Sequence, residues 1–238
     1  MMKARLIVAL DVATKDAARE VVKSLGGVVD FYKVGLELFT SVGPELVGEL
    51  RLGGCGIFLD LKLHDIPNTV AGAVRSATRV GAGLLTLHTL GGSEMMTAAR
   101  EAAEEEAGRV GHPAPHLLGV TVLTSQRGNR PVGGEDVGTV VLRLAESARA
   151  AGLSGVVASV EECAAIKAAC GADFLVATPG IRPAGISADD QKRIATPARA
   201  VEAGSDFLVV GRPVLRAKDP ARAARGILEE MRTSLGYL

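Results

Sequence analysis

Short apolar runs recur along the chain, separated by longer segments rich in Ala, Glu and Arg. The runs are nearly continuous in Val, Ile, Leu and Phe, which is typical of parallel strands covered on both faces. They lie at Leu6–Asp11, Phe31–Leu36, Gly56–Lys62, Leu84–His88, Leu117–Leu123, Gly155–Ser159, Phe174–Ala177 and Phe207–Gly211. The intervening segments have helical amphipathic spacing. They lie at Lys15–Leu25, Pro44–Leu52, Asn68–Val80, Ser93–Ala107, Val137–Ala151, Glu161–Ala169, Asp189–Ala203 and Ala221–Ser234.

Eight strands, each followed by a helix, predict an α/β protein with a closed (β/α)8 TIM barrel. The chain has 238 residues, a length that suits one such barrel, so residues 1–238 are predicted to form a single domain. An open doubly wound sheet would carry a glycine fingerprint after its first strand. The first run instead ends Ala9-Leu10-Asp11-Val12, which favours the barrel.

Composition narrows the function classes. Lys and Arg number 27 and so do Asp and Glu, and there is no Trp, which argues against a nucleic-acid-binding or membrane-surface protein. The three cysteines lack metal-ligand spacing and indicate a reducing compartment. The first apolar run is too short for a signal segment and no run could span a bilayer. We therefore predict a cytoplasmic protein.

Polar residues mark the carboxyl ends of the predicted strands, where TIM barrels carry their chemistry. The densest group follows the third run. Strand alternation points Asp60 and Lys62 to one face, and charges facing inward cost several kcal/mol unless they are paired. Asp65 adds a second carboxylate on the loop beyond. The alternative is a structural ion pair with a helix N-cap behind it.

Lys33, within the second run, completes an alternating set of two cations and two anions with Asp60, Lys62 and Asp65. Such a set suits electrostatic catalysis. Alone, a strand lysine could instead extend its ammonium to the rim of the barrel. Asp11, which ends the first strand, could simply cap the helix that follows.

A second candidate site lies in the loops after strands seven and eight. Barrels often bind phosphate there, where backbone N–H groups, glycines and cations converge. Gly180 and Gly211 permit close approach of a ligand, and Arg182 and Arg212 offer forked donors. The alternative is that glycines commonly end strands and arginines commonly coat surfaces.

The histidines do not predict a metal site, because no His-x-His or Glu-x-x-His spacing occurs. His64 is interpreted as a packed or dimer-contact residue, and His88 stays ambiguous.

With these motifs the chain resembles the orotidine 5′-monophosphate decarboxylases essentially from end to end. The motifs are Ala9-Leu10-Asp11, Tyr32-Lys33-Val34-Gly35, Asp60-Leu61-Lys62-Leu63-His64-Asp65-Ile66-Pro67-Asn68-Thr69, Thr178-Pro179-Gly180-Ile181-Arg182-Pro183, Asp190-Gln191-Lys192 and Val210-Gly211-Arg212-Pro213. The resemblance implies a decarboxylase of the last step of UMP synthesis that uses no cofactor and no metal. It implies a homodimer in which Asp65 reaches into the partner's site.

The resemblance also implies residue roles. Lys33, Asp60, Lys62 and Asp65 would form the catalytic network, with Lys62 protonating C6. Arg212, Gln191 and Gly211 would hold the 5′-phosphate, with Arg182 nearby. Asp11 and Lys33 would hold the ribose, and Thr124 would face the pyrimidine. The whole segment Asp60-Leu61-Lys62-Leu63-His64-Asp65-Ile66-Pro67-Asn68-Thr69 would contribute to substrate binding.

Two rival functions remain at this point. Sister barrels that decarboxylate a sugar phosphate share the Asp-x-Lys-x-x-Asp core but use magnesium, and the continuation Ile66-Pro67-Asn68-Thr69 favours the nucleotide enzyme. A non-catalytic phosphate-ligand sensor is the other rival. The intact set of four charged positions argues against it.

Overall fold

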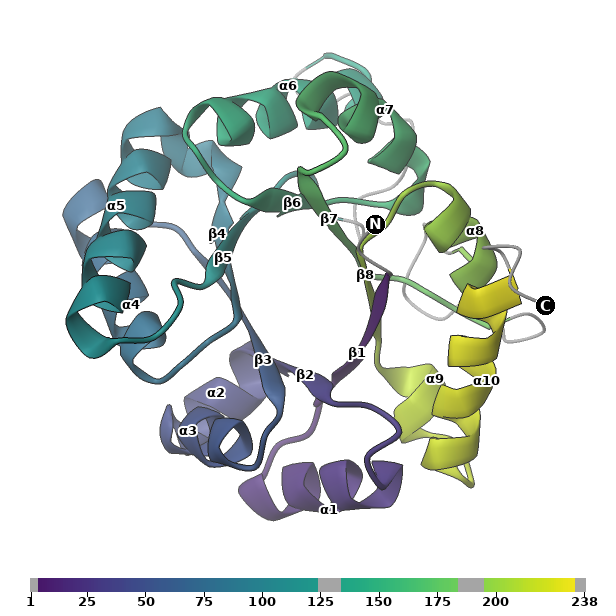
Figure 1. Ribbon diagram of the computed structural model, residues 1–238. Coiled ribbons are helices and arrows are strands. Elements are labelled where there is room, and N and C mark those ends of the chain that lie inside the picture. Colours follow the sequence, from purple (N-terminus) through teal and green to yellow (C-terminus); the bar gives the residue numbers. More distant parts are fainter. Residues whose placement is uncertain (1–3, 124–133, 184–194, 234–238) are drawn as a thin grey trace.

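The computed structural model describes residues 4–123, 134–183 and 195–233, and its strands close into a barrel. The strands pair in parallel in chain order, and β8 pairs with β1. They are β1 (Arg5–Ala9), β2 (Phe31–Gly35), β3 (Gly56–Leu63), β4 (Leu84–His88), β5 (His116–Val120), β6 (Gly155–Val157), β7 (Leu175–Thr178) and β8 (Phe207–Val210). Figure 1 shows the ring of strands inside a ring of helices. The predicted (β/α)8 fold is confirmed.

The helices cover the outside of the barrel (Figure 1). They are α1 (Lys15–Leu25), α2 (Leu36–Val42), α3 (Glu45–Leu52), α4 (Pro67–Arg79), α5 (Gly92–Val110), α6 (Val137–Ala150), α7 (Val160–Cys170), α8 (Pro197–Glu202), α9 (Arg212–Leu215) and α10 (Pro220–Thr233), with a 3-10 turn η1 (Thr89–Gly91). Among the described residues, none of these helices has the length and apolarity needed to cross a membrane.

Most predicted boundaries agree with the structure to within a residue or two. The predicted strand Leu117–Leu123 is observed as His116–Val120, the largest shift among the strands. The short elements α2, η1 and α9 were not predicted, because segments this short show no helical periodicity. Of the predicted helix Asp189–Ala203, the structure has α8, and residues 189–194 lie outside the described part of the chain.

The interior of the barrel is filled by side chains of one strand parity. This inner cluster contains Ile7, Ala9, Phe31, Phe58, Leu84, Leu118, Leu175, Ala177, Phe207 and Val209. Phe31 and Phe207 meet edge to face with ring centroids 6.0 Å apart. Two residues further along β2 and β3, the same parity places Lys33 and Asp60 above this apolar floor. The inward-facing positions are therefore apolar inside the barrel and charged at the carboxyl ends of β2 and β3.

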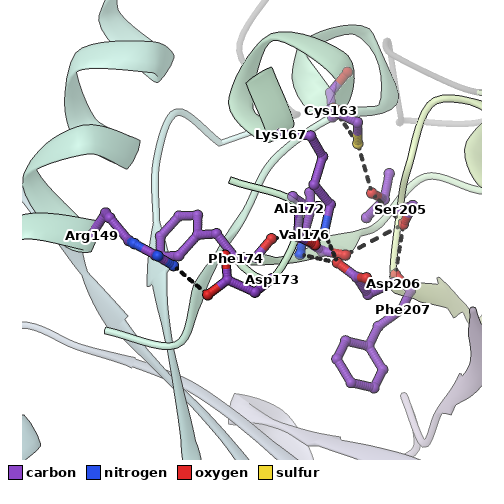
Figure 2. A network of polar contacts seen from close by, with 12 residues as sticks. Arg149, Cys163, Lys167, Ala172, Asp173, Phe174, Val176, Ser205, Asp206 and Phe207 are labelled. Atoms are coloured by element: carbon purple, nitrogen blue, oxygen red, sulfur yellow. Dashed lines mark hydrogen bonds and ion pairs between the residues drawn. The ribbon is translucent and has the colours of Figure 1, made fainter. Parts of the chain in front are cut away.

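A partly buried ion pair links α7 to the amino-terminal ends of β7 and β8, at the other end of the barrel (Figure 2). Lys167 Nζ lies 2.7 Å from Asp206 Oδ2 and donates to the carbonyls of Ala172 at 3.1 Å and Phe174 at 2.8 Å. Asp206 Oδ2 also accepts from the backbone N–H of Val176 at 2.7 Å. Because the charges are paired and hydrogen-bonded, they tolerate burial and fix α7 against the barrel.

Candidate active site

A cavity of ≈ 290 Å³ opens at the carboxyl ends of the strands. Eight of the predicted site residues line it: Asp11, Lys33, Asp60, Lys62, Gly180, Arg182, Gly211 and Arg212. The cavity is close in size to small-molecule sites, and both charged and apolar side chains line it. The two candidate sites inferred from the sequence are therefore the two sides of a single cavity.

Four side chains on one side of the cavity form a chain of alternating charge. Lys33 Nζ lies 3.0 Å from Asp11 Oδ1 and 3.7 Å from Asp60 Oδ2, and Lys62 Nζ lies 2.8 Å from Asp60 Oδ1. Asp60 and Lys33 are largely buried, with side chains 14% and 13% exposed, whereas Asp11 is 52% exposed. Gly35 makes room for this arrangement, since a Cβ there would lie 2.8 Å from Lys33 Nζ.

The chain of charges differs in one member from the predicted set. Asp65 does not line the cavity, and its exposed carboxylate accepts a hydrogen bond from the backbone N–H of Ile66 at 2.7 Å. Within a single protein molecule, the fourth charged group beside Lys33, Asp60 and Lys62 is Asp11. The sequence placed Asp65 correctly on the loop beyond β3, but that loop carries the side chain away from the other three residues.

The rest of the Asp60–Thr69 segment lies around the cavity rather than on it. Leu61 and Leu63 pack against the outer hydrophobic core between strands and helices. Pro67 opens α4, whose N-cap is Ile66. None of Leu61, Leu63, His64, Ile66, Pro67, Asn68 and Thr69 is among the cavity-lining residues of the described chain.

The backbone of β3 is irregular where its charges lie. Leu59 pairs with Leu85 and Leu63 pairs with Leu87, so four steps along β3 match two along β4. Within this bulge Lys62 has φ +51°, and among the described residues it is the one non-glycine residue with positive φ. This conformation is strained for a side chain with a Cβ and is found mainly at functional sites. Simple alternation predicted the face of Lys62 but not this bulge.

The other side of the cavity is built by the loops after β7 and β8. Gly180 has φ +82°, a conformation that favours glycine, and a Cβ on Gly211 would lie 3.0 Å from Asp11 Oδ2 and would crowd that carboxylate. Arg182 is 6% exposed and its Nη1 donates to the carbonyl of Ile181 at 2.9 Å. Arg212 opens α9 and lines the same wall. Two arginines thus line the same cavity as Lys33 and Lys62.

Two predicted site residues, Thr124 and Gln191, lie outside the described residues. The apolar residues of the cavity lining were not predicted from the sequence. They are Phe58, Val120, Val122, Leu123, Val157 and Val209. Strand parity could have found several of them, because they continue the inward-facing series of their strands.

His64 and His88 stack at the edge of the site, with ring centroids 5.3 Å apart. Burial lowers the pKa of His88 below its ordinary value, and nearby His64 and Lys62 lower it further. Its Nδ1 is buried without a hydrogen-bond partner. Among the described residues, no group of three His, Cys, Asp or Glu side chains could hold a metal ion.

Comparison with known proteins shows the family to which this chain belongs. The profile described as "Orotidine 5'-phosphate decarboxylase / HUMPS family" matches residues 4–227. The chain belongs to this family. A curated orotidine 5′-phosphate decarboxylase from Maridesulfovibrio salexigens is 52% identical over 229 residues, covering 95% of this chain and 98% of the relative. One from Syntrophotalea carbinolica is 49% identical over 234 residues, covering 97% and 96%.

The family also accounts for the fold. The crystal structure of orotidine 5′-phosphate decarboxylase from Lactobacillus acidophilus superposes with a TM-score of 0.81 at 37% identity, covering 96% of this chain and 99% of that one. The matched region of the orotidine 5′-phosphate decarboxylase / HUMPS family contains the whole cavity. The resemblance inferred from the motifs is confirmed.

Proposed function

We propose that this chain decarboxylates orotidine 5′-monophosphate to UMP, the last step of de novo UMP synthesis, without a cofactor. Relatives at about half identity over nearly the whole chain carry the name of that enzyme, which supports the reaction. The observation that carries the proposal is the charge chain Asp11–Lys33–Asp60–Lys62 in a cavity that two arginines, Arg182 and Arg212, also line. A nucleotide monophosphate matches both sides of such a cavity.

Lys62 is the proposed proton donor. When the bond from C6 to the carboxylate breaks, CO2 leaves and its electron pair stays on C6 as a carbanion that the ring delocalises poorly. The Lys62 ammonium can stabilise that pair and then transfer a proton to it, leaving a neutral amine that solvent reprotonates. Asp60, hydrogen-bonded to Lys62 at 2.8 Å, holds the ammonium in place before the reaction.

Binding of the rest of the nucleotide supplies further stabilisation. In this proposal Asp11 and Lys33 hold the ribose hydroxyls, and Arg212 holds the 5′-phosphate with Arg182 nearby; all four residues line the cavity. Interactions with such remote groups lower the barrier when they are used to fix the reacting ring against the charged network. Asp60 would also lie near the departing carboxylate, which adds like-charge stress.

A homodimer with shared sites is part of the proposal. Asp65 is exposed beside the carboxyl end of β3, outside its own cavity. Three large apolar side chains are exposed after the adjacent strands β2, β3 and β4: Leu36 at 56%, Ile66 at 66% and Leu90 at 64%. Large apolar side chains exposed at the carboxyl ends of neighbouring strands are candidates for a protein contact. A second copy seated here would cover them and could bring its Asp65 toward the opposite cavity.

The reaction and its independence of metal are tested together. We expect purified protein to convert orotidine monophosphate to UMP and CO2 at the same rate before and after exhaustive chelation, followed by absorbance and by product identification. Activity that is lost with the chelator and regained with Mg²⁺ would instead support the sugar-phosphate chemistry of the sister enzymes. Binding of UMP without release of CO2 would support a sensor.

Arg212→Ala tests the phosphate side of the cavity. Loss of a charge-assisted hydrogen bond should raise KM for orotidine monophosphate about 10- to 100-fold. Turnover should fall as well, because phosphate binding also positions the ring. Arg225→Ala, on the exposed face of α10, is the matched control and should match the wild-type enzyme in steady-state kinetics. An unchanged KM in Arg212→Ala would remove this residue from the phosphate site.

A further inference from the structure

Thr86 is a fully buried residue of β4 that no motif singled out. Its Oγ1 accepts a hydrogen bond from the backbone N–H of Lys62 at 2.9 Å and donates one to Asp60 Oδ1 at 3.0 Å. A hydroxyl has one proton and two lone pairs, so it can make both bonds at once. Thr86 therefore contacts the backbone of one member of the charge chain and the carboxylate of another.

The place of Thr86 in the sheet explains why a side chain makes these bonds. In the interrupted ladder between β3 and β4, the pairs Leu59–Leu85 and Leu63–Leu87 flank the bulge, and Thr86 is the β4 residue between them. The bulge takes the β3 backbone out of register at Lys62, whose φ is +51°. The threonine hydroxyl gives this displaced, partly buried N–H a hydrogen-bond partner in place of the one that a regular ladder would supply.

The bonds close into a ring. Lys62 N–H donates to Thr86, Thr86 donates to Asp60 Oδ1, and the same oxygen accepts from Lys62 Nζ at 2.8 Å. The backbone and the ammonium of Lys62 are thus tied to one carboxylate oxygen through Thr86. Removal of the Thr86 hydroxyl would break two of the three hydrogen bonds in the ring, while the charged groups of Lys62 and Asp60 would remain.

We propose that Thr86 is a positioning residue for the decarboxylation: its hydroxyl holds the left-handed Lys62 and the Asp60 carboxylate in the geometry that aims the ammonium at the reacting carbon. This inference rests on the proposed roles of Asp60 and Lys62. It assigns Thr86 no contact with substrate, and the residues proposed to bind phosphate and ribose come from the segment after β1, from β2 and from the loops after β7 and β8.

The series Thr86→Ser, Thr86→Ala and Thr86→Val separates positioning from packing. Serine keeps the hydroxyl, whereas valine keeps the shape of threonine without it. If Thr86 positions Lys62, kcat should fall about 10- to 100-fold in both the valine and alanine variants and stay near wild type in serine. KM for orotidine monophosphate and the Kd for UMP should change little. If Thr86 only fills space, valine should be the most active variant and alanine the least.

Thr78→Val is the matched control. Thr78 is equally buried, but its hydroxyl bonds the carbonyl of Val74 within α4, away from the cavity, so its replacement should leave kcat unchanged. Thermal melting and UMP binding establish that each variant is folded; if valine does not fold, the serine and alanine pair decides. Wild-type kcat in the valine variant, or a serine variant as slow as alanine, would overturn the proposal. An inactive wild type would instead contradict the proposed function.

Discussion

Lys62→Ala is expected to lose almost all turnover while still binding UMP. A cation about 4 Å from the developing carbanion contributes roughly 4 kcal/mol at an effective dielectric near 20. That corresponds to about three powers of ten in rate, and loss of the proposed proton donor should slow the reaction further. UMP binding should persist because the arginines and Asp11 line other parts of the cavity. Turnover is measured by stopped assays with orotidine monophosphate that carries a radiolabelled carboxylate. UMP binding is measured by calorimetry.

The matched control for Lys62→Ala is Lys23→Ala, which removes an exposed lysine from α1 and should leave both measurements unchanged. Alanine at position 62 keeps a Cβ at the strained backbone, so thermal melting should show a folded protein. Turnover near wild type in Lys62→Ala would contradict the proton-donor role. Loss of UMP binding together with turnover would mean that Lys62 mainly organises the cavity.

The charged side of the site could be predicted because strand parity is local information. Lys33 lies inward in the middle of β2, and Asp60 lies inward near the end of β3, two residues beyond Phe58. Once the barrel was inferred, the carboxyl ends of the strands had to converge, which brought Arg182 and Arg212 to the same cavity. Each of these steps needs only the spacing of residues within one element.

The features that could not be predicted depend on contacts between elements. The bulge at Lys62 is a mismatch in register between β3 and β4, and the role of Thr86 exists only because of it. The place of Asp11 in the charge chain depends on how β1 and β2 pair, with Ala9 beside Lys33. Asp65 was grouped with Lys33, Asp60 and Lys62 because the spacing of residues in the sequence does not fix the direction of a loop.

A mixture of Asp65→Asn and Lys62→Ala chains should regain activity that neither has alone. In a homodimer with shared sites, each heterodimer contains one cavity with both Lys62 and Asp65 intact. The other cavity lacks both. Random mixing makes half of the dimers heterodimers, so activity should rise to about a quarter of wild type. The asparagine side chain of the Asp65→Asn variant can still accept the hydrogen bond from Ile66 N–H, so the loop should keep its shape.

The measurement is turnover per chain after the two variants are unfolded together and refolded, with each variant refolded alone as the control. Heterodimers are verified by differently tagged chains. The exposed position of Asp65, apart from Lys33, Asp60 and Lys62 of its own chain, is the reason to expect recovery. Verified heterodimers that stay inactive would show that Asp65 does not serve the partner's cavity. A fully active Asp65→Asn chain would show that the charge chain from Asp11 to Lys62 suffices for the reaction.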